Sequence, residues 1–85
     1  MLKVYQRETC PYCKPVRERL TELNVTYINV NLPKKRSERK ELIEITGVPY
    51  IPALVDEDIV VAGKEESYEN VLEYIEKKFA NEKEY

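Results

Sequence analysis

The residues with the most distinctive chemistry are two cysteines, Cys10 and Cys13, which stand three positions apart in the stretch ETCPYCKPVRERL. The chain has no other cysteine and no histidine. Two thiols at this spacing can form a small disulfide, supply two ligands to a metal site, or exchange a dithiol for a disulfide in redox chemistry. These three interpretations differ in what they require from the rest of the chain.

The metal and structural-disulfide interpretations have little support. A structural zinc site normally takes four cysteine or histidine ligands, and this chain supplies two cysteines, so we expect no metal site of that kind. An iron–sulfur cluster shared between two chains and bound thiols stays open as an alternative. A disulfide that closes so short a loop removes little entropy from the unfolded chain. A cysteine protease is excluded because no histidine can act as its base.

Dithiol–disulfide exchange fits the local sequence better. Cys10 follows a predicted strand and lies where a helix is predicted to begin, so free N–H groups and the helix dipole favour its thiolate. Arg7 and Lys14 add positive charge nearby, and Pro11 suits the first helical position. Cys13, one turn further on, is expected to be more buried, to keep a pKa closer to the ordinary value, and to attack a mixed disulfide at Cys10.

The order of elements predicted around this pair is β-α-β-α-β-β-α, which indicates an α/β fold with a four-stranded mixed sheet and helices on both faces. The first two strands should pair in parallel through a crossover, and the last two strands should form a hairpin. Pro15 should loosen the first turn of the first helix. The predicted strands cover residues 2–6, 26–30, 53–55 and 59–62. The first predicted helix follows the cysteines and ends at Asn24, and the second begins near Pro33, has apolar contacts from Leu42, Ile43 and Ile45, and is capped by Gly47. The last predicted helix has an apolar stripe of Tyr68, Val71, Leu72, Ile75 and Phe79.

Composition and charge limit the classes of partner. Fourteen basic and sixteen acidic residues give a net charge of −2, which does not favour nucleic acid or a membrane surface as a partner. No apolar stretch approaches the roughly 20 residues that span a bilayer. No signal peptide precedes the first strand, so we expect a cytoplasmic protein with reduced thiols. We expect one domain over 1–85, with a polar tail from about residue 81.

A proline is expected to face the reactive sulfur, and the stretch VPYIPALV offers two candidates. If Pro49 began the third strand, Pro52 would interrupt the hydrogen-bond ladder of that strand. We therefore expect the strand to start at Pro52. A cis peptide bond between Ile51 and Pro52 is then a hypothesis, since the residues alone leave it near the base rate of about one X–Pro bond in twenty.

Three segments together resemble the glutaredoxin family, and the resemblance covers nearly the whole chain. RETCPYC resembles the family's active-site stretch, which has a basic residue three positions before the first cysteine. IPALV resembles the segment that carries the family's cis proline. The distance from Pro52 to the stretch GKEE at 63–66 resembles that from the family's proline to its glycine and acidic pair.

The resemblance implies a thioredoxin-like fold of the glutaredoxin type and a glutathione-dependent thiol–disulfide oxidoreductase. Such an enzyme reduces glutathione mixed disulfides and protein disulfides, takes electrons from glutathione, holds no bound cofactor and is expected to be a monomer. Cys10 would be the nucleophile and Cys13 the resolving thiol. The residues that the resemblance places against glutathione are Arg7 at its glycine carboxylate, Tyr12 at its flank, Ile51 and Pro52 along its cysteinyl part, Gly63 where the chain passes close, and Glu65 and Glu66 at its γ-glutamyl amine.

Several positions depart from the family's pattern. Ala62 stands where a glycine is frequent, and the acidic pair is glutamate rather than aspartate; these two acids equally suit an ordinary helix N-terminus. No basic residue shortly precedes Pro52, a place that Lys34 or Lys35 could fill from elsewhere. Two relatives therefore stay open: a redoxin that serves ribonucleotide reductase and is reduced by thioredoxin reductase, and the N-terminal domain of glutathione transferases, against which a lone domain with CPYC argues. A dimeric iron–sulfur cluster carrier stays a separate alternative for the cysteine pair.

Overall fold

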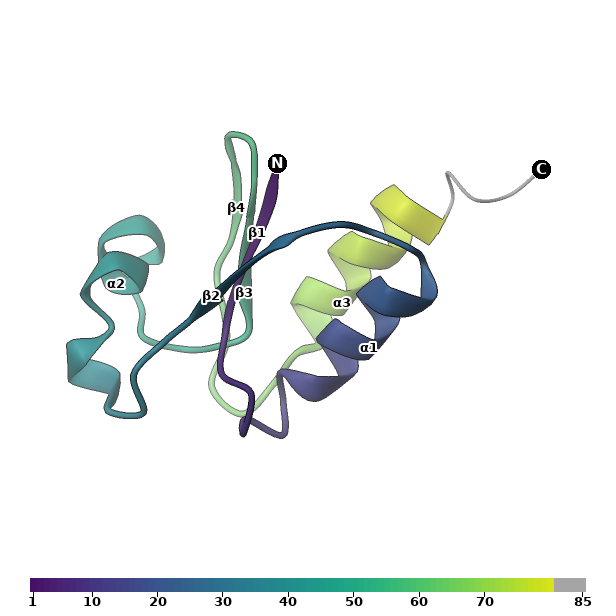
Figure 1. Cartoon of the computed structure of the whole chain (residues 1–85). Helices are drawn as coiled ribbons and strands as arrows, with labels where there is room; N and C mark the ends of the chain where they lie inside the picture. Colours follow the sequence, from purple (N-terminus) through teal and green to yellow (C-terminus); the bar gives the residue numbers. More distant parts are fainter. Residues whose placement is uncertain (81–85) are drawn as a thin grey trace.

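A four-stranded mixed sheet, with strand order β2-β1-β3-β4, forms the centre of the molecule (Figure 1). The computed structural model describes residues 1–80, so the predicted polar tail from about residue 81 lies outside the described residues. The order of strands and α-helices confirms the predicted β-α-β-α-β-β-α pattern. The elements are β1 (Leu2–Gln6), α1 (Lys14–Glu22), β2 (Ile28–Asn31), the 3-10 helix η1 (Arg36–Glu38), α2 (Lys40–Thr46), β3 (Ala53–Asp56), β4 (Ile59–Val61), α3 (Glu69–Ile75) and the π-helical turn η2 (Glu76–Ala80).

The strand pairings agree with the prediction. β1 and β2 run in parallel, with Lys3 opposite Ile28, and the helix α1 connects them. β1 and β3 are antiparallel, and β3 and β4 form the predicted antiparallel hairpin. Glu57 at the tip of this hairpin has a φ of 56°, which is the left-handed conformation that short hairpin turns need.

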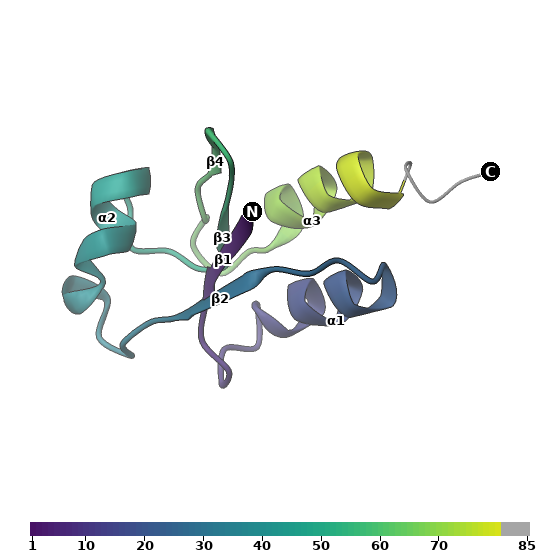
Figure 2. The same cartoon turned by 45° about the horizontal axis from the view of Figure 1, so that its top comes forward.

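Helices cover both faces of the sheet, with α1 and α3 on one face and α2 on the other (Figures 1 and 2). Because side chains alternate along a strand, β1 contributes side chains to the cores on both faces of the sheet. Val4 packs into the core beneath α1 and α3, where Leu20 and Ile75 are also fully buried. Tyr5 packs into a second core with Leu42 of α2. Cys13 belongs to this second core, so the turn that carries Cys10 and Cys13 (the cysteine turn) is anchored in the interior.

The first helix begins three residues later than predicted. It starts at Lys14 and not at Pro11, and the residues between Cys10 and Cys13 form a turn closed by a 3.2 Å bond from the Cys13 N–H to the Cys10 carbonyl. The reason is Pro15, which has no N–H to bond back to the Pro11 carbonyl, so no α-helical turn closes there. The predicted loosening by Pro15 is thus confirmed.

The C-terminal end of α1 follows the prediction. Asn24 adopts a left-handed φ of 57°, and the Val25 N–H bonds to the Leu20 carbonyl at 2.9 Å. This is a Schellman cap, in which asparagine commonly takes the left-handed position. Since Val25 is held by this cap, β2 begins at Ile28 rather than at residue 26.

The second helix departs most from the prediction. The prediction that it begins near Pro33 is wrong, because the chain first forms η1 and enters α2 at Lys40. The Arg39 side chain donates to the carbonyls of Pro33 and Lys34, at 2.9 and 3.1 Å, so these carbonyls are not free to begin a helix. Gly47 caps α2 with a φ of +84°, as predicted. Ile45, expected in the core, is exposed because this short helix buries its Leu42 side.

The fourth strand ends at Val61, one residue before the predicted end. The Asn70 side chain donates to the Ala62 carbonyl at 2.7 Å and takes the acceptor that a longer strand would use. In the last helical segment, Val71 and Ile75 are fully buried and Tyr68, Leu72 and Phe79 are partly buried. The predicted apolar stripe therefore forms part of the core.

A buried carboxylate fastens the last helical segment to the sheet. Asp56, at the end of β3, accepts a 2.6 Å hydrogen bond from the Tyr74 hydroxyl and another from the Lys78 ammonium. Burial by itself raises the pKa of Asp56, but the hydrogen bonds from Lys78 and Tyr74 outweigh burial and hold that pKa below its usual value. The folded state therefore favours the ionised carboxylate.

The lowered pKa of Asp56 predicts that the folded protein loses stability in acid. Because its pKa is lower in the folded than in the unfolded chain, the stability it contributes is present above about pH 4 and is lost as the pH falls further. We expect Asp56→Asn to lower the free energy of unfolding at pH 7 by about 2 kcal/mol and to flatten its fall between pH 5 and pH 3. Urea unfolding at a series of pH values measures both effects.

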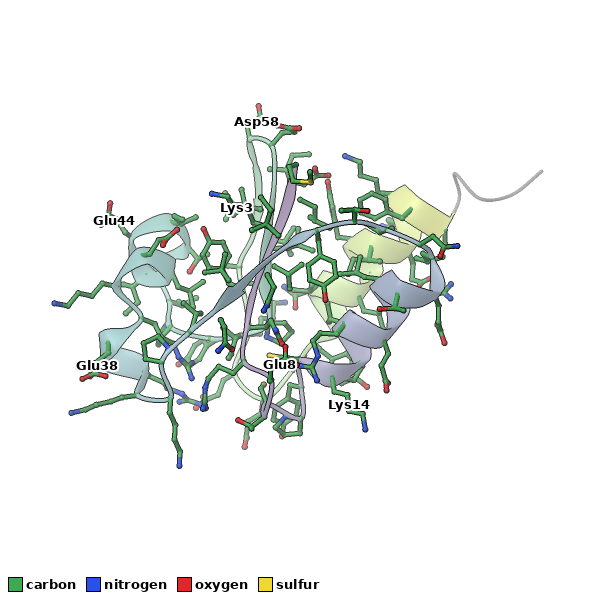
Figure 3. All side chains as sticks on the ribbon, viewed as in Figure 1. Lys3, Glu8, Lys14, Glu38, Glu44 and Asp58 are labelled. Carbon is green, nitrogen blue, oxygen red and sulfur yellow. The ribbon has the colours of Figure 1, made fainter. Side chains whose placement is uncertain are left out.

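The hairpin tip supplies the control for this prediction. Asp58 is exposed and points away from the sheet at the tip of the β3–β4 hairpin (Figure 3). Asp58→Asn should leave the free energy of unfolding at pH 7 within about 0.5 kcal/mol of the parent. Equal losses in the two variants would contradict the role of Asp56.

Candidate functional site

The two cysteines lie in the turn between β1 and α1. Cys10 is half-buried, and its backbone N–H donates to the Arg7 carbonyl at 3.1 Å. Cys13 is fully buried at the N-cap of α1, so the prediction that it is the more buried thiol is confirmed. Both thiols are free, and the Cys13 thiol is within hydrogen-bonding reach of the Cys10 sulfur. The pair therefore combines an accessible sulfur with a second sulfur directly behind it.

The surroundings of Cys13 disfavour its thiolate. Burial, and after it the hydrogen bond with Cys10, raise the pKa of Cys13 well above its usual range. The Arg7 backbone and the positive charge of Arg17 act in the opposite direction and are weaker. The expectation that Cys13 keeps a pKa close to the ordinary value is therefore wrong, because the first turn lies deeper in the core than the sequence indicates.

A buried polar network holds the cysteine turn in place. Arg17 of α1 donates to the Arg7 and Glu8 carbonyls, at 3.2 and 3.3 Å, and to the fully buried Gln6 side chain at 2.7 Å. The Gln6 amide in turn donates to Glu8 at 2.8 Å and to Asn29 at 2.5 Å. One guanidinium thus ties α1 to the end of β1 and to the loop that leads to Cys10. Sequence reasoning did not identify this role of Arg17.

A cavity of about 200 Å³ opens beside Cys10. Its wall is made by three segments: the cysteine turn, the region from η1 to the start of β3, and the loop after β4. The lining residues are Arg7, Thr9, Cys10, Pro11, Tyr12, Arg36, Arg39, Tyr50, Ile51, Lys64 and Glu66. The fold thereby brings residues that are far apart in the sequence around one sulfur.

Four of the residues predicted to contact glutathione line this cavity: Arg7, Tyr12, Ile51 and Glu66. Glu65 does not line it, and its carboxylate pairs with Arg36 at 3.2 Å. Lys14, expected to add charge near Cys10, is also outside the lining and points outward from the first turn of α1 (Figure 3). The cavity lining therefore includes some, but not all, of the residues that were predicted to surround Cys10.

Two further predicted residues shape the cavity from behind. The peptide bond between Ile51 and Pro52 is cis, as predicted, and Pro52 is fully buried directly before β3. Gly63 passes close to the same segment: a Cβ atom at this position would stand 2.2 Å from the Tyr50 carbonyl oxygen and 2.8 Å from the Pro52 carbonyl oxygen. The expectation that the chain passes close at Gly63 is confirmed.

Sequence reasoning missed three cations of the cavity: Arg36, Arg39 and Lys64. The two lysines offered as substitutes for a missing basic residue, Lys34 and Lys35, do not line the cavity. These three side chains meet the cysteine turn only in three dimensions, so local sequence patterns did not indicate that they line one cavity. The one available signal was the spacing of Arg36 and Arg39, which places them on the same side of a helical turn.

The glutaredoxin family model matches residues 2–61 of this chain, which include both cysteines and the cis proline. A glutaredoxin-like 8.6 kDa protein from the rubredoxin operon of Clostridium pasteurianum, itself uncharacterised, is 33% identical over 76 residues, which cover 86% of this chain and 99% of that protein.

The chain belongs to the glutaredoxin family. Its thioredoxin-like fold agrees with solved glutaredoxins: one from Archaeoglobus fulgidus is 32% identical, with a TM-score of 0.62 over 87% of this chain and 84% of that one. A buckwheat glutaredoxin in complex with glutathione is 20% identical, with a TM-score of 0.69 over 94% of this chain and 73% of that one. A silkworm glutathione S-transferase shares the fold with a TM-score of 0.80 at 24% identity over 96% of this chain, which spans 39% of that protein.

Residues 1–80 contain no group of three or more histidine, cysteine or carboxylate side chains placed to hold a metal ion. No helix in this range is both long and apolar enough to cross a membrane.

Proposed function

We propose that this glutaredoxin-family chain is a glutathione-dependent thiol–disulfide oxidoreductase that reduces glutathione mixed disulfides and protein disulfides. The observation that carries the proposal is the half-buried Cys10 beside a cation-lined cavity, with the fully buried Cys13 directly behind it. An accessible sulfur can attack a substrate, while a buried second thiol is protected from other reactions until a mixed disulfide forms next to it.

The reaction consists of two thiol–disulfide exchanges. With a glutathione mixed disulfide, the Cys10 thiolate attacks the glutathione sulfur, forms a Cys10–glutathione S–S bond, and releases the other sulfur of the substrate as a thiolate. A glutathione thiolate then attacks the mixed disulfide, restores the Cys10 thiolate and leaves as oxidised glutathione. With a protein disulfide, Cys13 attacks the mixed disulfide instead, and two glutathione molecules reduce the resulting Cys10–Cys13 bridge.

The cavity offers groups that suit the parts of glutathione. Its glycine carboxylate would meet Arg7 and Arg39, and its amine would meet Glu66. The Ile51 backbone beside the cis proline would pair with the cysteinyl part like an added strand, and Tyr12 would lie along its flank. The buckwheat glutaredoxin of the same fold, which was solved with glutathione, supports this choice of ligand.

One observation keeps a second donor in consideration. The Arg36–Glu65 ion pair and the neighbouring Lys64 leave Glu66 as the one carboxylate that lines the described cavity. The glutathione amine would therefore find fewer acids than the family pattern provides. A redoxin that is reduced by thioredoxin reductase is the alternative that this arrangement favours.

A side-by-side reduction assay tests the proposal. The oxidised protein is incubated with glutathione, glutathione reductase and NADPH, and in parallel with thioredoxin reductase and NADPH, while NADPH consumption is followed. We expect faster reduction by glutathione. Faster reduction by thioredoxin reductase would replace the proposed donor, and a coloured dimeric preparation with visible absorption would indicate a cluster carrier.

A further inference from the structure

Four cations line the cavity beside Cys10, although the chain as a whole has a net charge of −2. Arg36 is paired with Glu65 and Glu66 also lines the cavity, but no ion pair joins a carboxylate of residues 1–80 to the Arg7, Arg39 or Lys64 side chain. Arg39 is 6% exposed and donates to the carbonyls of Pro33, Lys34 and Pro49. A buried guanidinium without a neutralising carboxylate is unusual, because unpaired buried charge costs free energy.

The cations also repel one another. Burial lowers the pKa of Arg39, and the neighbouring positive charges of Arg7 and Arg36 lower it further. Such a cluster is stabilised when negative charge enters the space between its members. The cavity is therefore built to receive anions around the Cys10 sulfur.

Glutathione uses this positive charge only in part. It carries two carboxylates and one ammonium, so at neutral pH it brings a net charge of −1 to the cavity. When Cys10 attacks a protein disulfide, moreover, no glutathione has yet entered, so its carboxylates do not offset the positive charge of the cavity. The first exchange with a protein is thus the step on which the uncompensated charge acts most strongly.

The positions of the cations indicate the shape of the partner. Arg7 comes from the loop after β1, Arg36 and Arg39 from η1 and the residue after it, and Lys64 from the loop after β4. They therefore approach Cys10 from three segments of the chain. An extended peptide that lies across the Cys10 sulfur can place acidic side chains near more than one of these segments. A small thiol with its charges at one end reaches fewer of the segments.

We propose that the preferred protein substrates carry aspartate or glutamate within one or two residues of the cysteine that Cys10 attacks. This inference rests on the proposed thiol–disulfide exchange and names the class of substrate for the same site. Complementary charge raises the association rate and falls in effect with ionic strength, so the preference has a defined kinetic signature.

Single-turnover kinetics with three peptide disulfides test the proposal. The disulfide-linked dimers of Gly-Asp-Cys-Asp-Gly, Gly-Asn-Cys-Asn-Gly and Gly-Lys-Cys-Lys-Gly are mixed with the reduced protein in the absence of glutathione. Each rate constant is divided by that of the same dimer with dithiothreitol, which corrects for the reactivity of the disulfide itself. We expect the acidic dimer to react about tenfold faster than the neutral one, and this ratio to shrink in 0.5 M salt.

Two variants assign the effect to the cavity. Lys64→Gln should reduce the acidic-to-neutral ratio about threefold, whereas Lys34→Gln, which removes a lysine outside the lining, should leave it unchanged. A small polyanionic disulfide, that of mercaptosuccinate, serves as a further arm. If its corrected rate constant exceeds that of the acidic peptide dimer, the cavity selects small anions and the peptide proposal is wrong.

The remaining outcomes separate this inference from the function on which it rests. Equal corrected rates for the three peptides would overturn the acidic preference and leave thiol–disulfide exchange intact. A reduced protein that reacts with none of the disulfides would overturn the proposed function itself.

Discussion

Cys10→Ser is expected to lower the turnover of glutathione mixed disulfides by about 10³-fold or more, because a serine hydroxyl is not ionised near neutral pH and cannot replace a thiolate nucleophile. Cys13→Ser should retain this activity, since glutathione itself can resolve the mixed disulfide at Cys10, but it should lose the reduction of protein disulfides that need an internal resolving thiol. Initial rates with a glutathionylated peptide and with a protein disulfide measure both effects. Full activity of Cys10→Ser would contradict the assignment.

The buried position of Cys13 adds a pH dependence to this prediction. Because burial raises its pKa, Cys13 is protonated at pH 7, and each increase of one pH unit raises its thiolate fraction about tenfold. The rate at which the Cys10–glutathione disulfide converts to the Cys10–Cys13 bridge, followed without free glutathione, should therefore rise about tenfold per unit between pH 7 and pH 9. A plateau below pH 8 would indicate that Cys13 ionises readily.

Gly63→Ala is expected to cause the largest loss of stability, about 3 kcal/mol or more in the free energy of unfolding. Its Cβ atom would stand 2.2 Å from the Tyr50 carbonyl oxygen and 2.6 Å from the carbonyl carbon, and these backbone atoms cannot move without shifting the segment next to the cis proline. Since Tyr50 and Ile51 line the cavity, the activity of any folded fraction should also fall. Urea unfolding and the turnover assay measure the two effects.

The only other glycine is a matched control. Gly47 caps α2 with a φ of +84°, and a Cβ atom there would meet nothing within 4 Å. Gly47→Ala should therefore cost only the strain of a left-handed alanine, about 1 kcal/mol, and leave the cavity unchanged. If Gly63→Ala is no less stable than Gly47→Ala, the close approach at Gly63 does not carry the stability assigned to it.

The predicted elements were accurate where local chemistry decides. β1 was placed at its observed bounds, and Asn24 and Gly47 end their helices with the predicted left-handed residues. At each of these helix ends one residue type favours the backbone conformation by itself, so neighbours in the sequence contain enough information. The cis bond before Pro52 was instead implied by the resemblance to the glutaredoxin family.

The errors in the fold arose where a side chain competes for a backbone hydrogen bond. Arg39 takes the carbonyls that would have begun a helix near Pro33, and Asn70 takes the carbonyl that would have extended β4. The start of α1 is different, because Pro15 itself prevents a helical turn before Lys14. This boundary was predictable from the sequence, because the missing N–H of Pro15 is evident there.

The sequence alone indicated the candidate cysteine pair, the order of the elements and the resemblance to the family, because the spacing of Cys10 and Cys13, the apolar periodicity and the position of Pro52 are local patterns. Only the tertiary structure decided the depth of Cys13 and the charge of the cavity, to which Arg36, Arg39 and Lys64 come from separate segments. The physical reason is that burial and electrostatic interactions depend on distance in space, and packing against the sheet sets those distances.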